Sequence, residues 1–304
     1  MNRVNRYPSR VMRPHQYFPA QTTASFTLVI IHGMQEHGRR YQAFAEYLSR
    51  QGGNIISFDL PGHGVEKPKD ALGDFGTEGL ATSLTAIDEF FQRYAQSLPK
   101  VLFGHSMGST LALRYAQQHD LDLLILCGVP VNPVWVLELG YRAAKLEQRL
   151  RPQQASVFSN IFKWYNRRFQ PCTTASDWLS ANPDNVQAYL DDPLCGYALS
   201  PSYYLEMFGL MRHALAAKEL AKLDSQLKIL VIWGADDPVT DFGKGTRHLV
   251  NKLQALNYSV ASQEYAGLRH EILNEVEPLP IYADVLHFIK ANLESSVIRH
   301  ALVS

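Results

Sequence analysis

One five-residue stretch of the chain has the residue types that nucleophilic chemistry needs. Gly104-His105-Ser106-Met107-Gly108 follows an apolar run at 101–103 and precedes a segment with helical periodicity that begins near Ser109. A serine on a strained turn from a strand into a helix projects its hydroxyl over the sheet, because the small flanking residues let strand and helix approach closely. A glycine-rich turn without chemical function is the simpler interpretation, but the flanking strand and helix favour Ser106 as a nucleophile.

A serine hydroxyl is a poor nucleophile unless an adjacent base accepts its proton and an acid orients that base. After a turn of this kind the acid and then the base follow in the chain, each behind a later strand. The segment 234–239 follows an apolar run and offers two carboxylates, Asp236 and Asp237, between which the residues alone do not choose. His270 follows the last short strand-like segment, so we predict that it is the base.

The negative oxygen that forms when a serine attacks a carbonyl needs two preorganised N–H donors. The backbone amide after the nucleophile is one of them, and here it belongs to Met107. The second comes from the loop after an early strand, and Met34 in the segment 31–38 is placed to supply it. We therefore predict an oxyanion hole formed by the amides of Met34 and Met107.

Short apolar runs alternate with segments of helical periodicity along most of the chain. The runs predict strands over residues 28–31, 55–58, 101–103, 123–126, 229–233 and 259–265, and the periodic segments predict helices over 41–50, 80–96, 109–118 and 245–256. Strands joined through helices form a mostly parallel sheet covered on both faces, with sites beyond the carboxyl ends of the strands. The pattern thus predicts an α/β fold that brings the candidate residues to one edge.

The alternation stops between about residues 130 and 210, where aromatic residues and prolines are frequent and no strand-like run occurs. A structureless loop of this length is uncommon in a compact domain, so we predict a helical insertion. The sheet pattern resumes at residue 227. The insertion therefore interrupts one domain and does not separate two.

Composition disfavours several functional classes. The 304 residues carry 29 Lys plus Arg against 29 Asp plus Glu, so the formal net charge is zero and does not favour general binding to nucleic acid. The longest apolar runs have about five residues, far short of the roughly 20 that cross a bilayer. Three scattered cysteines, Cys127, Cys172 and Cys195, favour a reducing compartment over a disulfide framework, and we expect a cytoplasmic protein.

Several loops, considered together, resemble one known family. They are Ile31-His32-Gly33-Met34-Gln35-Glu36-His37 with Arg40-Tyr41, Phe58-Asp59-Leu60-Pro61-Gly62-His63-Gly64, the loop around Ser106, and Asp191-Asp192-Pro193-Leu194-Cys195-Gly196-Tyr197. The sequence resembles the monoacylglycerol lipase and lysophospholipase branch of the α/β-hydrolase fold, whose members are also described as serine-aminopeptidase-like hydrolases. Residues 234–239 look like the acid loop of that family, which selects Asp237, and residues 267–275 look like its histidine loop, which again selects His270.

The resemblance spans roughly residues 15 to 293 and implies an α/β-hydrolase fold, with a mostly parallel central sheet, helices on both faces and a helical cap. The core would comprise residues 26–130 and 211–304, the cap residues 131–210, and residues 1–25 an N-terminal arm that could supply one edge strand. The implied enzyme is a serine hydrolase. It would cleave carboxylic esters of lipid-like small molecules, such as a monoacylglycerol or a lysophospholipid, without a metal or organic cofactor.

The predicted cap is also basic, with seven Lys or Arg residues between 141 and 168 against Glu147 alone. A basic amphipathic cap could rest on an anionic lipid surface as a peripheral contact. A solvated helix face is the simpler interpretation, since aspartates nearby restore the charge balance.

Two other functions remain compatible with the fold. The same three side chains serve amides, so an aminopeptidase or amidase is the alternative, and it would need a polar anchor for a free amino terminus. A non-catalytic module that binds a lipid or a protein is disfavoured by the complete set of serine, aspartate and histidine. The sequence leaves the acyl-chain length, the headgroup and the oligomeric state open.

Overall fold

The computed structural model of the chain describes residues 16–65, 72–76 and 79–303, with side chains up to residue 293. The predicted basic arm at residues 1–15 lies outside the described residues. Within the described part, every helix is too short or too polar to cross a lipid bilayer.

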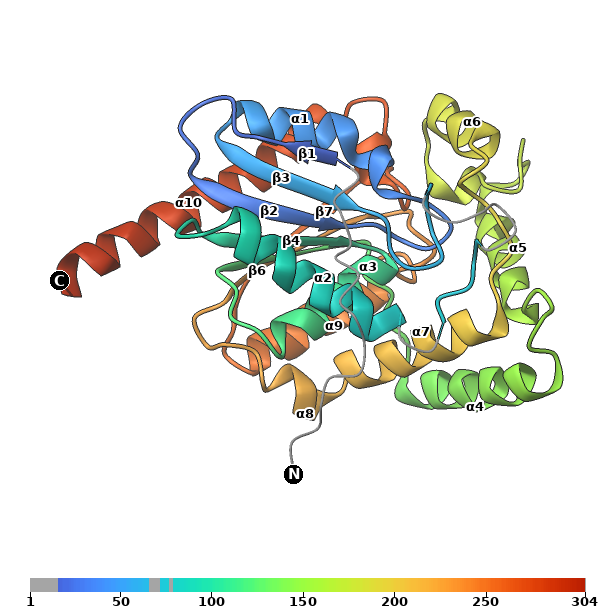
Figure 1. The fold of residues 1–304 in the computed structure, drawn as a ribbon. Coiled ribbons are helices and arrows are strands. Elements are labelled where there is room, and N and C mark those ends of the chain that lie inside the picture. The colour runs from blue at the N-terminus through green and yellow to red at the C-terminus, as the bar shows by residue number, and fades with distance from the viewer. Residues whose placement is uncertain (1–15, 66–71, 77–78, 304) are drawn as a thin grey trace.

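Seven strands form one sheet in the order β1-β3-β2-β4-β5-β6-β7 (Figure 1). The strands are β1 (Gln16–Phe18), β2 (Phe26–Ile31), β3 (Gly53–Phe58), β4 (Lys100–His105), β5 (Leu123–Cys127), β6 (Lys228–Gly234) and β7 (Ser259–Tyr265). Strands β2 to β7 pair in parallel, and only β1, at one edge, pairs antiparallel, with β3. The predicted mostly parallel sheet is confirmed.

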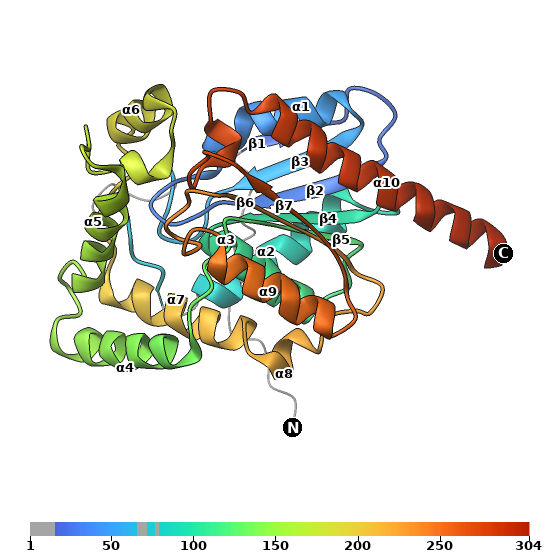
Figure 2. The ribbon, with the colours of Figure 1, turned by 180° about the vertical axis from the view of Figure 1, so that it is seen from behind.

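Helices cover both faces of the sheet (Figures 1 and 2). On one face lie α1 (Gln42–Arg50) and α10 (Leu279–Val303), and on the other α2 (Gly79–Tyr94), α3 (Met107–Ala116) and α9 (Lys244–Ala255). The apolar side chains form one large cluster on each face. Burial on both sides explains why every residue of the central strands β2 and β5 is buried, with β5 a continuous apolar run and β2 apolar except for Thr27.

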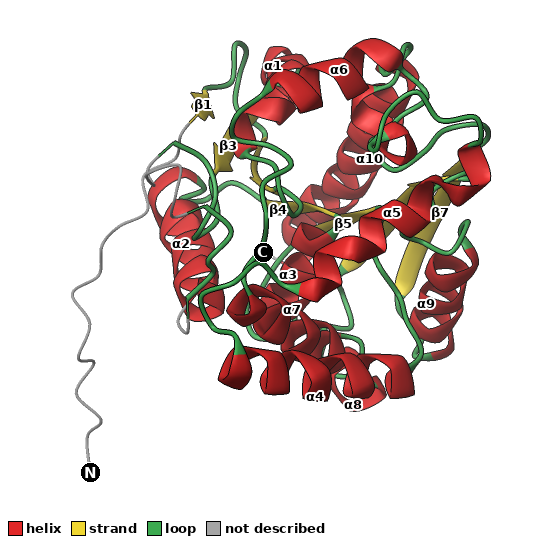
Figure 3. Cartoon of the chain, turned by 90° about the vertical axis from the view of Figure 1, so that its right-hand side faces the viewer, coloured by secondary structure: helices red, strands yellow, loops and turns green. Residues whose placement is uncertain are grey.

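The chain between β5 and β6 forms helices and, among the described residues, no strand. They are α4 (Val134–Leu150), α5 (Phe162–Tyr165), α6 (Pro183–Asp191), α7 (Pro201–Ala214), α8 (Ala217–Leu220) and the short 3-10 turns η3 (Val157–Ile161), η4 (Asn166–Phe169) and η5 (Asp177–Leu179). Figure 3 looks onto this layer, with α4, α5 and α7 in front of the sheet. Helix α7 continues past residue 210 and packs against both α4 and α3.

Two further 3-10 turns lie in the loops that approach the sheet edge. They are η1 (Gly38–Tyr41), which leads into α1, and η6 (Ile272–Asn274), which precedes α10. In Figure 1 the arrowheads of β2 and β3 point toward the layer of helices between β5 and β6. The carboxyl ends of the parallel strands and this helical layer therefore enclose the region where a site is expected.

Candidate active site

Ser106 lies on a sharp turn between β4 and α3. Its φ of 54° and ψ of −123° fall in a region that non-glycine residues rarely occupy. The Ser106 amide donates a hydrogen bond to the Cys127 carbonyl at 2.9 Å, and the Ser109 hydroxyl donates to the Ser106 carbonyl at 2.5 Å. These bonds hold the strained turn in place at the end of β4.

The two glycines of the turn allow a very close approach of backbone segments. A Cβ at position 104 would lie 2.3 Å from the Gly108 carbonyl oxygen, and one at position 108 would lie 2.4 Å from the Ile31 carbonyl oxygen. Carbon and oxygen atoms cannot approach so closely, so any side chain at either position would push α3 away from β4 or β2. The glycines that flank Ser106 are thus required by packing.

His270 and Asp237 meet at the same edge of the sheet. His270 Nδ1 lies 2.9 Å from Asp237 Oδ2, and both side chains are buried. The other Asp237 oxygen accepts a hydrogen bond from the Val239 amide at 2.8 Å, which fixes the orientation of the carboxylate. Asp236 is exposed, so Asp237 is the carboxylate that contacts the ring.

Both predicted oxyanion donors border the cavity that Ser106 and His270 line. Met107 is the first residue of α3, where backbone N–H groups lack partners within the helix. Met34 lies in a turn that the Gly33 amide closes by donating to Glu36 Oε1 at 2.6 Å.

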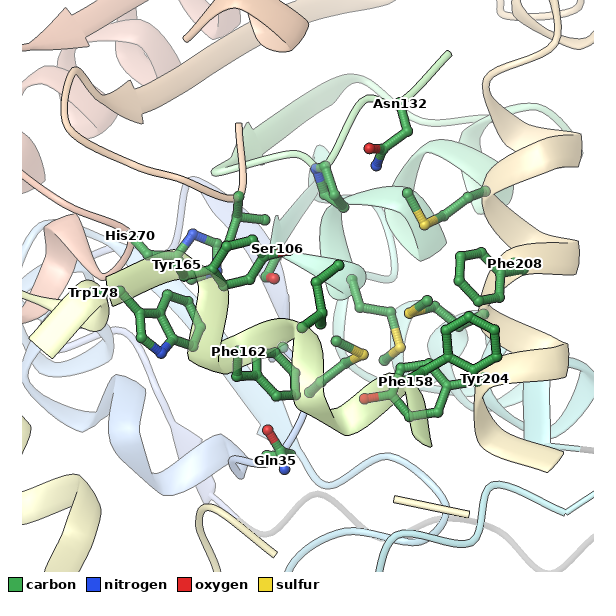
Figure 4. Close-up of a pocket in the computed structure, with 18 of the residues that line it drawn as sticks. Gln35, Ser106, Asn132, Phe158, Phe162, Tyr165, Trp178, Tyr204, Phe208 and His270 are labelled. Atoms are coloured by element: carbon green, nitrogen blue, oxygen red, sulfur yellow. The ribbon is translucent and has the colours of Figure 1, made fainter. Parts of the chain in front are cut away.

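A cavity of about 420 Å³ begins at Ser106 and extends beneath the helices that follow β5. Figure 4 shows Phe162, Tyr165 and Trp178 near Ser106 and His270, whereas Phe158, Tyr204 and Phe208 lie at the other end. The Trp178 ring centre is 5.5 Å from that of His270. A largely apolar cavity of this size is typical of sites for small organic ligands.

A family model described as "Serine aminopeptidase, S33" matches residues 22–277. The chain belongs to the serine aminopeptidase S33 family. The S33 chain is 26% identical over 287 residues to a monoacylglycerol lipase of Mycolicibacterium smegmatis, with 88% of each chain covered. It is 35% identical over 262 residues to a putative monoglyceride lipase of Schizosaccharomyces pombe, with 83% of this chain and 63% of that one covered.

Solved structures agree with this assignment. A carboxyl esterase of Bacillus coagulans superimposes on the S33 chain with a TM-score of 0.83 and 25% identity, covering 91% of this chain and 93% of that one. A monoacylglycerol lipase of Paleococcus ferrophilus, at 24% identity and a TM-score of 0.68 over 91% and 99% of the chains, has the same fold. The S33 chain therefore has the α/β-hydrolase fold and is a serine ester hydrolase of the lipase and esterase type, similar to monoacylglycerol lipases.

A buried ion network in the S33 chain links the loops around Ser106 and His270. The Arg40 guanidinium donates to Glu271 from two nitrogens, at 2.5 and 2.7 Å, and to Glu36 at 3.2 Å. Glu36 also accepts from the Tyr41 hydroxyl at 2.9 Å. Because Glu271 follows His270 and Glu36 follows the Met34 turn, Arg40 joins the two loops directly.

His105 extends this network to the residue before Ser106. Its Nδ1 lies 3.2 Å from Glu36 Oε1 and its Nε2 lies 3.1 Å from the His270 carbonyl oxygen. Both partners only accept hydrogen bonds, so the geometry requires a proton on each ring nitrogen. Burial alone would lower the pKa of His105, but the bond to Glu36 and the negative charge of Glu36 raise it.

The contact between His105 and Glu36 also shifts the pKa of Glu36. Burial would raise the pKa of this carboxyl, yet the hydrogen bond with His105 and the charges of His105 and Arg40 hold the pKa below its ordinary value. The network in the S33 chain thus contains two buried cations and two buried carboxylates, which compensate one another.

Sequence reasoning assigned no role of their own to several residues of this site. Arg40 and Glu36 entered only through the family resemblance, and their partner Glu271 is 231 positions from Arg40 in the chain.

Gly128, with a φ of 57°, lies against His270 and Asp237, where a Cβ would be 3.1 Å from the imidazole. In the sequence, Gly128 is marked only by its place at the end of the apolar run that begins at residue 123. Trp178 had no distinguishing signal among the aromatic residues of the insertion.

Proposed function

We propose that this S33 hydrolase cleaves carboxylic esters of lipid-like small molecules through Ser106, His270 and Asp237. The hydrogen bond between His270 Nδ1 and Asp237 Oδ2, beside a largely apolar cavity that both His270 and Ser106 line, is the observation that carries the proposal. With Nδ1 bonded to the carboxylate, Nε2 is left to accept the proton of the Ser106 hydroxyl.

In the proposed reaction, Ser106 Oγ forms a bond to the ester carbonyl carbon while His270 takes its proton. The amides of Met34 and Met107 donate to the oxyanion of the tetrahedral intermediate. The intermediate collapses as the carbon–oxygen bond to the alcohol breaks and His270 returns the proton to the leaving oxygen. Water, deprotonated by His270, then attacks the acyl-enzyme and releases the carboxylic acid.

Substitution of the nucleophile tests the reaction. We expect Ser106→Ala to lower kcat/KM for p-nitrophenyl butyrate by roughly 10⁴-fold or more, with an unchanged melting temperature, and we expect a fluorophosphonate to label the unmodified protein at Ser106 only. Turnover that survives in purified Ser106→Ala would refute the assignment.

The two neighbouring aspartates offer a matched test of the acid. Asp237→Asn leaves the shape of the side chain but removes the charge that orients His270, and we expect a loss of roughly 10⁴-fold in kcat. Asp236→Asn makes the same replacement of one carboxylate oxygen by an NH2 group at the exposed neighbour and should retain full activity. Equal activities of the two variants would remove Asp237 from the mechanism.

We propose that residues 131–210 form the cap of this enzyme and that the acyl chain occupies the cavity beneath it. Apolar side chains from α4, α5 and α7 supply the lining, which suits a hydrocarbon chain. Monoacylglycerols and lysophospholipids are the substrates we propose, on the strength of that lining and of the relatives named monoacylglycerol or monoglyceride lipase.

The aminopeptidase alternative needs a charged or polar anchor for a free amino terminus, and a carboxylate would be the strongest such anchor. The two carboxylates among the described lining residues, Glu36 and Glu271, are both paired with Arg40. We therefore expect hydrolysis of monoacylglycerols and lysophosphatidylcholine, and none of aminoacyl naphthylamides, in one panel assay. Preferential cleavage of the naphthylamides would reverse this choice.

We propose that the outer face of α4 contacts an anionic lipid surface. Trp135, Leu146 and Leu150 lie on one stripe of this helix and are 70%, 57% and 71% exposed, with Arg142 and Lys145 beside them. Sedimentation with phosphatidylcholine vesicles that contain phosphatidylglycerol should weaken for the double variant Trp135→Ser, Leu146→Ser. Leu256→Ser, at an exposed leucine after α9, is the control, and equal sedimentation of both variants would contradict the proposal.

A further inference from the structure

Gln35, the residue after Met34, has an unfavourable backbone conformation. Its φ is 56°, in the left-handed region that a non-glycine residue rarely adopts. Gln35 is nevertheless buried and lines the cavity (Figure 4). Because the conformation of Gln35 sets the direction of the peptide groups on either side of it, whatever holds Gln35 also orients the loop that carries the Met34 amide.

The contacts that hold Gln35 come from residues 192–197, which we call the return segment because they lead from α6 back toward α7. The Gly196 amide donates to the Gln35 carbonyl oxygen at 3.0 Å. The Gln35 side-chain amide donates to the Tyr197 carbonyl oxygen at 2.5 Å. The backbone of Gln35 is therefore bonded to Gly196 and its side chain to the adjacent Tyr197.

A third contact fixes the loop two residues further on. His37 Nε2 lies 2.8 Å from Asp192 Oδ2, and the other Asp192 oxygen accepts from the Leu194 amide at 2.8 Å. The His37 side chain is only 5% exposed, so loss of Asp192 would leave a buried imidazole nitrogen without its partner. Asp192 thus anchors the return segment to the loop 33–37 and also shapes the segment itself.

We propose that the return segment positions the oxyanion hole, with Gln35 and Asp192 as positioning residues that keep the Met34 amide aimed at the substrate carbonyl. This inference rests on the function proposed above, because it requires that the Met34 amide be an oxyanion donor. The layer of helices after β5 then acts on the reaction itself as well as on the shape of the acyl cavity.

The substitutions at position 35 separate backbone conformation from side-chain contact. Gln35→Ala and Gln35→Gly lose the same hydrogen bond to Tyr197, but only glycine adopts a positive φ without strain. With p-nitrophenyl acetate, whose acyl group is too short to probe the cavity, we expect Gln35→Ala to lose roughly tenfold in kcat. That is less than the 10²–10³-fold loss of an absent donor. Gln35→Gly should retain clearly more of kcat, and KM should change little in either variant.

Two adjacent aspartates provide the second arm of the test. Asp192→Ala removes the anchor of the return segment and should lower kcat for the acetate ester several-fold. Asp191→Ala alters the exposed preceding residue, whose carboxylate accepts a hydrogen bond from the Gln187 side-chain amide at 2.9 Å, and should leave kcat unchanged. Melting temperatures of all four variants show whether each one is folded.

The outcomes distinguish this inference from the proposed function. If a fluorophosphonate labels Ser106 in the unmodified protein while Gln35→Ala and Gln35→Gly have equal kcat values, the inference is wrong and the function stands. Asp192→Ala with the kcat of Asp191→Ala would overturn it as well. If the unmodified protein is neither labelled nor active on any ester, the proposed function itself has failed.

Discussion

Arg40 is the residue whose removal should have the largest effect on stability outside the apolar core. Its side chain is 9% exposed, and those of its partners Glu36 and Glu271 are each 4% exposed. Arg40→Met keeps most of the volume and the apolar stem, but it leaves two buried carboxylates without their shared cation. Breaking a buried ion pair by removing one partner costs about 3 to 5 kcal/mol of folding free energy.

Urea unfolding followed by circular dichroism measures this cost. With an m-value of about 3 kcal/mol/M, the midpoint of Arg40→Met should fall by about 1 to 1.7 M. Arg212→Met is the matched control, because Arg212 also makes a 2.5 Å contact with a carboxylate, that of Glu138, but at a position where both side chains are about one-third exposed. We expect the control to shift the midpoint far less.

The pH dependence provides a second check on the same reasoning. In the variant, Glu36 has lost the charge of Arg40, so the native state of the variant takes up protons at a higher pH than that of the unmodified protein, and the variant loses less stability as the pH falls. In the unmodified protein the pKa of Glu36 is held below its ordinary value, so its contribution is still present from pH 7 to pH 5 and is lost only below the pKa of the unfolded state. The difference between the two proteins should shrink from pH 7 to pH 5. Equal midpoint shifts for Arg40→Met and Arg212→Met, or a difference that grows in acid, would refute the reasoning.

Two further predictions concern the cavity and its surroundings. Burial, together with the nearby His32, lowers the pKa of His63 to about 3, so the unfolded state binds the proton first as the pH falls from 7 to 5. The free energy of unfolding should therefore fall by about 2 kcal/mol over that range, and urea unfolding of His63→Gln should not show this loss. The same pH dependence of the unfolding free energy in both proteins would contradict the prediction. A Cβ at Gly140 would lie 2.7 Å from the Phe208 ring, whereas one at Gly209 would lie 3.5 Å from its nearest neighbour. Gly140→Ala should therefore push Phe208 into the cavity and lower kcat/KM for long p-nitrophenyl esters relative to short ones. Gly209→Ala should keep the chain-length profile of the unmodified protein. Identical profiles for both variants would show that Phe208 does not limit the cavity.

The central strands could be predicted because burial on both faces leaves a continuous apolar run in the sequence. The expected strand at 259–265 coincides with β7, and the run at 28–31 falls short of β2 by two residues. The helix expected at 109–118 begins two residues later than α3, because the turn at Ser106 leads into the helix without an intervening loop. Strand β1, with three residues and partial exposure, is too short to leave such a pattern.

The candidate site was predictable wherever a single loop carries its own signal. Ser106 and His270 each follow a strand, and their side chains then border one cavity because parallel strands end at one edge. Contacts between loops that are far apart in the chain could not be recognised from the sequence. The partners of Arg40 and Gln35 lie far along the chain, and only folding shows that a charged pair is buried or that a return segment ties down a turn.

The attachment of helix α7 to α3 bears on which segments of this enzyme can be exchanged with those of a relative. The Tyr203 hydroxyl bonds the Met107 sulfur at 3.0 Å, and Gln117 donates to the Ala214 carbonyl oxygen at 2.7 Å, so α7 is fastened to α3 at both ends. The stretch from α4 to η4 carries neither of these bonds to α3. We expect insertions or exchanges there to remodel the proposed acyl cavity without disturbing the turn at Ser106, so this stretch is where a chimera with a relative of different selectivity should be joined.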